Sequence, residues 1–378
     1  MKGFIRWCSN LYRLFIKELR SIKADSIMLV LVLYAFTLAI YSVSTGASTE
    51  IKNLAIAVVD EDKSQLSRRI TDALQPPIFL NAAEISASEV DVALDKGRFV
   101  FVVDIPPNFE ADVLANRPTA LQIEIDATAI VFAGNGSVAL QNIITNELME
   151  FQLGRGQTSA APVNLVIRSS FNPNLTSMWF GSMMQVMNNI TMLTMILAGA
   201  ALIRERERGT VEHLLVMPVL PNQIVLSKIL ANALVIVLAA MLSLVLVVQQ
   251  LLQVPIAGSL GLFLFGTAIY TLSIASLGIL LATFSTSMAQ FGLLAIPVLI
   301  VLNLLSGGMT PMESMPVFLQ YAMQIFTTTP HFVSFTQSVL FRGAGIELVW
   351  RELLIFIGYG MIYYLISLAR FRKAVLKS

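Results

Sequence analysis

The chain has 378 residues, of which 56% are apolar and only 13% are charged, about half the charged share of an average soluble domain. Its mean hydropathy of +0.74 predicts an integral membrane protein and excludes an ordinary soluble enzyme. The net charge of +1 hides a segregation: residues 46–177 hold nine Lys and Arg against sixteen Asp and Glu, and the remainder holds sixteen against eight. We therefore expect the acidic block and the basic remainder to lie in different places.

Residues 1–25 predict a basic amphipathic helix at the membrane surface. Its apolar residues recur at helical spacing and its basic residues occupy another face, which is typical of a helix in the headgroup layer. Six basic residues precede Ser26 and only Glu18 and Asp25 oppose them, so the positive-inside rule places the N-terminus in the cytoplasm. Residues 26–49 carry no charge and suffice for a first transmembrane helix.

Residues 50–176 predict an inserted extracytoplasmic α/β domain. Strands are indicated at residues 54–60, 78–82, 99–104 and 120–126, and helices at 64–74, 87–96, a segment ending near 115, and 131–153. The block has no histidine or cysteine and no recognisable nucleophile arrangement, which favours binding or gating over catalysis. The run Asp60, Glu61 and Asp62 suits a bound cation, and a turn after a strand explains it equally well.

Residues 177–378 predict five further spans. One occupies 177–203, and the interval between Lys228 and Glu313, which holds no charge, suits three more near 224–252, 260–284 and 291–305. Residues 306–349 predict an outer re-entrant segment, and a last span is expected at 353–369, followed by basic residues. The fold class is thus an α-helical integral membrane protein with six transmembrane helices, both termini cytoplasmic, and an inserted α/β domain. The turn expected on the cytoplasmic side at 285–290 contains no Lys or Arg, although the positive-inside rule favours basic residues there.

A charged connection at residues 204–221 joins two of these spans. Its alternating charges must lie at the membrane surface, and Gly209 can end one helix where Thr210 can cap the next. We expect a short cytoplasmic helix there, with Arg206 and Glu212 in charge-assisted contacts, either inside the chain or with a partner. Internal bracing is favoured for Glu205 and Arg206.

Polar side chains interrupt the second span, and Asn303 lies at the outer end of the fifth. They favour helix-to-helix hydrogen bonding, with contact to a transported molecule as the alternative, because polar groups at that depth need protein or water partners. The candidates for a substrate path are Gln185, Asn188, Asn189, Thr191 and Asn303.

Motifs for chemistry are missing from the sequence. No G-x-x-x-x-G-K-[S/T] motif occurs, so the chain is not expected to bind or hydrolyse nucleotides by itself. Both histidines stand alone without metal-ligand spacing, and no basic aromatic patch suits nucleic acid. We therefore predict no catalytic residues, no metal site, no cofactor on this chain and no nucleic-acid partner.

The arrangement of one span, a large outer domain and five further spans resembles the permease subunits of ABC-2-type transporters, in particular bacterial inner-membrane exporters with an extracytoplasmic α/β domain. The pattern Glu-Arg-x-x-Gly-Thr-x-Glu-x-Leu-x-x-x-Pro carries the resemblance, and the run Leu305-Ser-Gly-Gly-Met-Thr-Pro311 adds to it. In that family, the pattern forms the connection that the ATP-binding partner contacts. The resemblance assigns ATPase coupling to Arg204, Glu205, Arg206, Glu207, Arg208, Gly209, Thr210, Glu212, His213, Leu214, Met217 and Pro218, and an outer gate to Gly307, Gly308, Pro311, Pro330 and His331.

The resemblance implies a bacterial inner-membrane permease pair, either a homodimer or a complex with a similar paralogue. Cytoplasmic ATP-binding cassette subunits would bind ATP and Mg²⁺, and a periplasmic membrane-fusion protein is a further candidate partner. Without intramembrane carboxylates, a large amphipathic or hydrophobic substrate, drug-like or lipid-like, is favoured over a small ion. The alternatives are a membrane-anchored sensor or scaffold with a ligand-binding outer domain, and a membrane-embedded enzyme.

Overall fold

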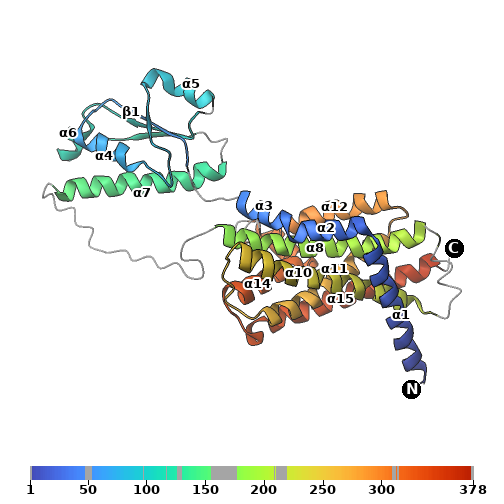
Figure 1. Cartoon of the computed structure of the whole chain (residues 1–378). Helices are drawn as coiled ribbons and strands as arrows, with labels where there is room; N and C mark the ends of the chain where they lie inside the picture. Colours follow the sequence, from blue (N-terminus) through green and yellow to red (C-terminus); the bar gives the residue numbers. More distant parts are fainter. Residues whose placement is uncertain are drawn as a thin grey trace. The chain divides into compact units, whose positions relative to one another are not determined.

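The computed structural model describes residues 2–46, 53–96, 98–115, 117–125, 130–154, 177–207, 209, 219–308, 312 and 315–375. The chain divides into two compact units, one formed by Met1–Ser48 with Ser169–Ser378 and the other by Thr49–Arg168. The first unit is a bundle of helices and the second combines helices with a small sheet (Figure 1).

The Thr49–Arg168 unit is built on a four-stranded sheet in the order β2-β1-β3-β4. Strands β1 (Ile56–Asp60), β2 (Ala83–Glu84) and β3 (Phe101–Ile105) are parallel, and β4 (Gln122–Ile125) pairs antiparallel with β3. The helices are α4 (Gln65–Ala73), η1 (Ala87–Glu89), α5 (Val90–Asp95), α6 (Phe109–Leu114) and α7 (Ile130–Gly154).

Alternating side chains of β1 and β3 give this sheet two buried faces. On one face, Ile56 and Phe101 pack with residues of α4, α6 and α7, and on the other Val59 and Val102 pack with Val90 of α5. Figure 1 shows α4 and α7 on one side of the strands and α5 on the other. The unit therefore has a hydrophobic core of its own.

The helical unit is organised around α8 (Ser177–Glu207). The other elements are α1 (Lys2–Ala24), α2 (Ser26–Phe36), α3 (Leu38–Gly46), α10 (Pro221–Leu242), α11 (Leu260–Thr283), α12 (Met288–Leu304), α13 (Val317–Phe326), α14 (Thr329–Thr336) and α15 (Ile346–Val375). Two π-helical segments, η2 (Ser243–Leu251) and η4 (Gln337–Phe341), extend α10 and α14. The apolar part of α8 is mostly buried and that of α15 is mostly exposed, so α8 is the central helix and α15 a peripheral one.

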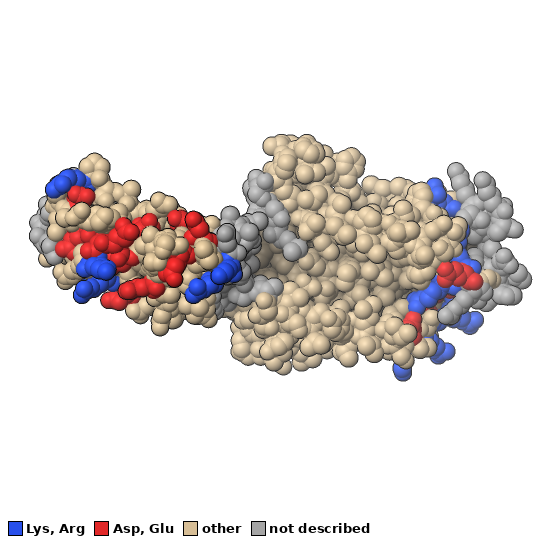
Figure 2. Space-filling model, turned by 90° about the horizontal axis from the view of Figure 1, so that it is seen from above, with Lys and Arg blue, Asp and Glu red and all other residues tan. Residues whose placement is uncertain are grey.

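Within the described ranges, five helical stretches are long and apolar enough to cross a membrane: Ser26–Gly46, Met178–Glu207, Pro221–Leu251, Leu260–Thr283 and Ile346–Phe371. A sixth apolar helix, Met288–Leu304, is shorter, at 17 residues. The sixth span thus stays a prediction. In the view of Figure 2, charged residues of the helical unit gather at one end, and the rest of the face seen there carries none.

Several elements differ from the sequence-based predictions. The first span is divided into α2 and α3 at Thr37. The strand expected at 78–82 forms only an isolated bridge, Leu54 to Phe79, and the second strand lies at Ala83–Glu84. The connection expected at 204–221 begins inside α8, which continues to Glu207, and ends at Pro221, the first residue of α10.

Candidate functional site

The last turn of α8 contacts a different neighbour with each of four consecutive side chains, Arg204, Glu205, Arg206 and Glu207. Consecutive residues of an α-helix are about 100° apart around its axis, because each turn takes 3.6 residues. Four in a row therefore point in four directions. This turn is the first part of the connection at residues 204–221, to which the resemblance assigns ATPase coupling.

Arg204 binds the junction between α1 and α2. Its Nη1 donates to Oδ2 of Asp25 at 2.5 Å. Asp25 is the N-cap of α2, where its Oδ1 accepts a hydrogen bond from the backbone N–H of Met28 at 3.1 Å. One carboxylate thus starts α2 and joins it to the end of α8.

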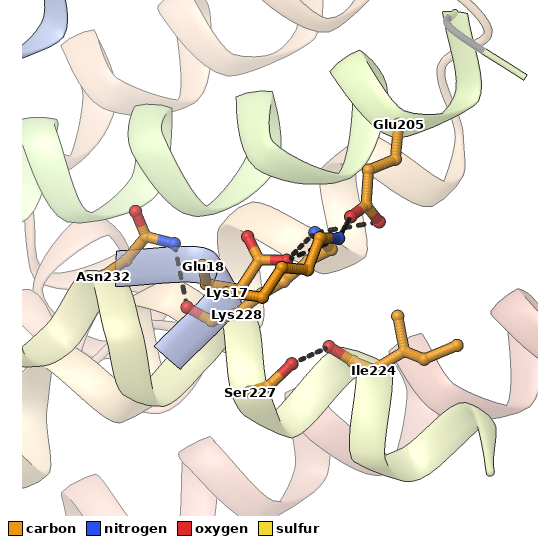
Figure 3. A network of polar contacts seen from close by, with 7 residues as sticks. All are labelled: Lys17, Glu18, Glu205, Ile224, Ser227, Lys228 and Asn232. Carbon is orange, nitrogen blue, oxygen red and sulfur yellow. Dashed lines mark hydrogen bonds and ion pairs between the residues drawn. The ribbon is translucent and has the colours of Figure 1, made fainter. Parts of the chain in front are cut away.

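Glu205 lies in a cluster of four charged side chains that joins α1, α8 and α10 (Figure 3). The ammonium group of Lys228, on α10, is 2.9 Å from Oε1 of Glu18 and 2.9 Å from Oε2 of Glu205. Lys17 donates to Glu205 and is 3.3 Å from Oε1 of Glu18. Burial opposes the charge of Lys17, but Glu205 and Glu18 outweigh burial and raise the pKa of Lys17.

The cluster is buried at its centre and open at one edge. The side chain of Lys228 is 1% exposed, those of Glu18 and Glu205 are 8% and 12% exposed, and that of Lys17 is 46% exposed. A buried charge is tolerated only when it is paired and hydrogen-bonded. Two lysines against two glutamates leave the cluster neutral.

Arg206 and Glu207 hold the turn between α11 and α12. The Nη1 of Arg206 donates to the carbonyl of Ser285 at 2.8 Å, and Oε1 of Glu207 accepts from the backbone N–H of Met288 at 2.8 Å. Arg370, near the end of α15, lies 3.6 Å from the ring centre of Phe284. The turn that lacks basic residues of its own is therefore held by cations from α8 and α15.

The remainder of the predicted coupling segment lies mostly outside the described residues: this holds for Arg208, Thr210, Glu212, His213, Leu214, Met217 and Pro218. Gly209 is described and has a φ of +64°, the left-handed conformation that ends helices. The predicted partner contact of Glu212 stays a prediction.

The candidate path residues on α8 fall into two groups. Asn189 is buried and donates to the carbonyl of Ala35 in α2 at 2.5 Å, and the hydroxyl of Thr191 is 2.8 Å from that of Tyr270 in α11. Gln185 donates to Asn189 at 3.2 Å. Asn189 and Thr191 are therefore engaged in bonds between helices.

A half-exposed stripe follows one side of α8. From Gly181 to Ile196 every residue is buried except Gly181, Gln185, Asn188, Met192 and Ile196, which are partly exposed and recur three or four residues apart. Asn188 belongs to this stripe, whereas Asn303 lies partly exposed on α12. The stripe mixes amide, thioether and aliphatic groups on one face.

The candidate gate residues are packed against the ends of helices. Gly307 has a φ of +86°, and a Cβ there would lie 2.8 Å from Met312. Gly308 lies against Met184 of α8, Pro330 is buried in the first turn of α14, and Nε2 of His331 is 3.0 Å from the carbonyl of Gln324. Pro311 lies outside the described residues.

Sequence reasoning missed Lys228 and Glu18 as partners. Lys228 falls inside the stretch predicted as a span, 224–252, and was used there only as the boundary of the uncharged interval. The available signal was a lone lysine at the start of a long uncharged interval, together with a lone acid inside a basic helix.

The acidic run of the other unit forms a turn. Oδ1 of Asp60 accepts from the backbone N–H groups of Asp62 and Lys63 at 3.1 and 2.8 Å, and Oδ2 accepts from the hydroxyl of Ser67 at 2.8 Å. Oδ2 of Asp62 accepts from the N–H of Glu110 at 3.0 Å. These carboxylates brace the loops that follow β1 and β3.

Comparison with known proteins decides the family. The model of the ABC-2 family transporter proteins matches residues 26–369. The chain belongs to this family. It is 46% identical to the inner membrane transport permease YhhJ of Escherichia coli (strain K12), over 98% of this chain and 99% of that protein. It is 28% identical to the probable multidrug ABC transporter permease YbhR of the same strain, over 91% and 93%.

As an ABC-2 family permease with several apolar helices, the protein is a multi-pass membrane protein that serves transport. A further relative, the probable multidrug ABC transporter permease YbhS, is 25% identical over 87% of this chain. This membership does not favour the sensor or scaffold alternative.

Proposed function

We propose that this protein is the membrane-spanning permease subunit of an ATP-driven exporter in a bacterial inner membrane. In this proposal six helices cross the membrane, α12 among them, both termini are cytoplasmic and the Thr49–Arg168 unit is periplasmic. A separate cytoplasmic subunit binds ATP and Mg²⁺ and contacts residues 204–221. Two permease chains, identical or similar, form the pathway, and a periplasmic membrane-fusion protein is a candidate partner.

The observation that carries the proposal is the set of contacts made by the last turn of α8. Its four side chains reach the α1–α2 junction, the α1 and α10 helices, and the α11–α12 turn. A force applied to the segment just beyond Glu207 would therefore act on most of the bundle at once. An ATP-driven permease needs a stiff connection of this kind.

For the substrate, we propose an amphipathic or hydrophobic molecule, drug-like or lipid-like. The half-exposed stripe of α8 offers Gln185 and Asn188 for hydrogen bonds and Met192 and Ile196 for apolar contact. Met adapts its shape to different ligands. The word multidrug in the names of YbhR and YbhS agrees with this class. Gly307, Gly308, Pro311, Pro330 and His331 are proposed for the outer gate.

The test is reconstitution of the permease with its candidate ATP-binding cassette subunit in proteoliposomes. We expect ATP-dependent movement of a lipophilic fluorescent dye, and loss of ATPase co-purification in Glu212→Lys. Glu61→Lys is the matched control, because it reverses an exposed acid in the other unit. A permease that binds no such subunit, or transports equally well without ATP, would contradict the proposal.

A further inference from the structure

We propose that Lys228 is a positioning residue that fixes α1 to α8 and α10, so that α1 moves with the ATP-driven segment. The inference rests on the proposed function and adds a part to it. The amphipathic N-terminal helix then moves during the transport cycle, because the buried ammonium group of Lys228 joins it to α8 and α10.

Lys228 is placed to join three helices that are far apart in the sequence. A lysine ammonium group has three hydrogen-bond donors and no acceptor. Here it lies 2.9 Å from a carboxylate of α1, Glu18, and 2.9 Å from a carboxylate of α8, Glu205. In Figure 3 the Lys228 and Lys17 side chains point between the two glutamates. The contact is thus shared by α1, α8 and α10 at one atom.

Other contacts fasten α1 along its length. Near its start, Nε2 of Gln223 on α10 donates to the carbonyl of Trp7 at 3.0 Å. Just beyond its end, Asp25 pairs with Arg204 of α8. Lys228 supplies the central attachment. Because α1 is held at its start, middle and end to the two helices that flank the coupling segment, it has to follow their movement.

Charge balance explains why the central attachment depends on Lys228 more than on Lys17. Both lysines contact both glutamates, but Lys228 is buried and Lys17 is nearly half exposed. Without Lys228, two largely buried carboxylates would share one cation at the edge. Without Lys17, water at the open side can hydrate the carboxylates that lost this cation. A buried charge that loses its partner is costly, whereas removal of a complete ion pair is often tolerated.

This difference separates a positioning role from a role in stability alone. Lys228→Met leaves a surplus negative charge, and we expect low yield of folded protein. The double variant Lys228→Met with Glu18→Gln is neutral again, so it should fold, yet it has no ion pair between α1 and α10. The exchange variant Lys228→Glu with Glu18→Lys is also neutral and keeps such a pair. The two neutral variants therefore differ in whether an ion pair joins α1 to α10.

Cys8 provides the reporter for α1. It is the single cysteine of the chain and it is exposed, so a nitroxide attached to it reports the environment of α1 in the otherwise unchanged sequence. The full permease, reconstituted with its ATPase subunit, is measured with and without ATP. The wild-type spectrum should change on ATP addition. The change should be smaller in the neutral double variant, in which Lys17, Gln223 and Arg204 still hold α1, with dye transport reduced at least tenfold. It should return to the wild-type size in the exchange variant.

The control is Arg20→Gln, which removes an exposed positive charge of α1 outside the cluster and should retain the spectral change and transport within about threefold of wild type. A wild-type permease that transports dye with no change at Cys8 would overturn the inference and leave the proposed function standing. The inference is also wrong if the neutral double variant transports normally with an unchanged response at Cys8. Failure of the wild type to transport with ATP would count against the proposed function itself.

Discussion

Asn189 separates a packing role from a substrate role at the level of a single residue. Its side-chain N–H donates to the carbonyl of Ala35 while the residue is buried. Hydrogen bonds between membrane helices contribute about 0.6 to 1.7 kcal/mol. We expect Asn189→Ala to lower the unfolding free energy by about that amount with the range of transported dyes unchanged, measured by thermal unfolding in detergent and by transport.

Asn188→Ala is the matched variant one residue away on the same helix. Asn188 lies on the half-exposed stripe, so its loss should leave thermal unfolding unchanged and alter which dyes are transported. If the two variants exchanged these phenotypes, Asn189 would belong to the pathway and the stripe would not.

At the same scale, the sequence predicted a charged, internally braced segment at the end of α8 but not the residues that it contacts. The alternating charges of Arg204 to Glu207 cannot be buried in lipid, and internal bracing was expected for Glu205 and Arg206. The identity of the partners depends on tertiary packing. No local pattern relates Lys228 to Glu18, 210 residues away, and a lysine near the end of an apolar run reads as a boundary. Its partners appear only when three helices meet.

Close packing of two helices at Gly278 is the element-scale feature with the sharpest consequence. A Cβ added to Gly278 of α11 would lie 2.4 Å from the carbonyl oxygen of Met195 on α8. Small residues let membrane helices approach this closely. Gly278→Leu should force α8 and α11 apart at a cost of about 1 to 3 kcal/mol or more, seen as loss of monodisperse protein in size-exclusion chromatography.

Gly292 of α12 is the control for this substitution. A Cβ there would meet no atom within 4 Å, so Gly292→Leu should elute as the wild type does. Equal behaviour of the two variants would show that the close approach of α8 and α11 does not govern folding of the bundle.

Elements with a strong local pattern were predicted well, and elements set by tertiary contacts were not. The apolar runs of β1 and β3 and the polar helix α4 lie within a few residues of their predicted bounds. The pairing order β2-β1-β3-β4 has no local signal. The break at Thr37 between α2 and α3 occurs within an uncharged run that hydropathy alone treats as one helix, because hydropathy does not report backbone geometry.

At the scale of the whole molecule, the division into two units has a consequence for folding. The Thr49–Arg168 unit has buried residues on both faces of its sheet, and Arg69 of α4 pairs with Glu147 of α7 at 3.0 Å. A domain with its own core can fold alone. The helical unit, in contrast, presents apolar side chains on most of its helices and needs a lipid or detergent environment.

We therefore expect residues 49–168, expressed without the helical unit, to be a soluble monomer. It should unfold cooperatively in urea, with an m-value of about 1 to 3 kcal/mol/M. The measurement is circular dichroism as a function of urea concentration, compared with amide hydrogen exchange of β1 and β3 as a second probe. Phe101→Ala should lower the unfolding free energy by about 3 to 5 kcal/mol, because Phe101 is fully buried against Phe79 at a ring separation of 6.0 Å. Exposed Glu61→Ala should change it little. A gradual, non-cooperative transition would mean that the unit depends on the membrane helices for its stability.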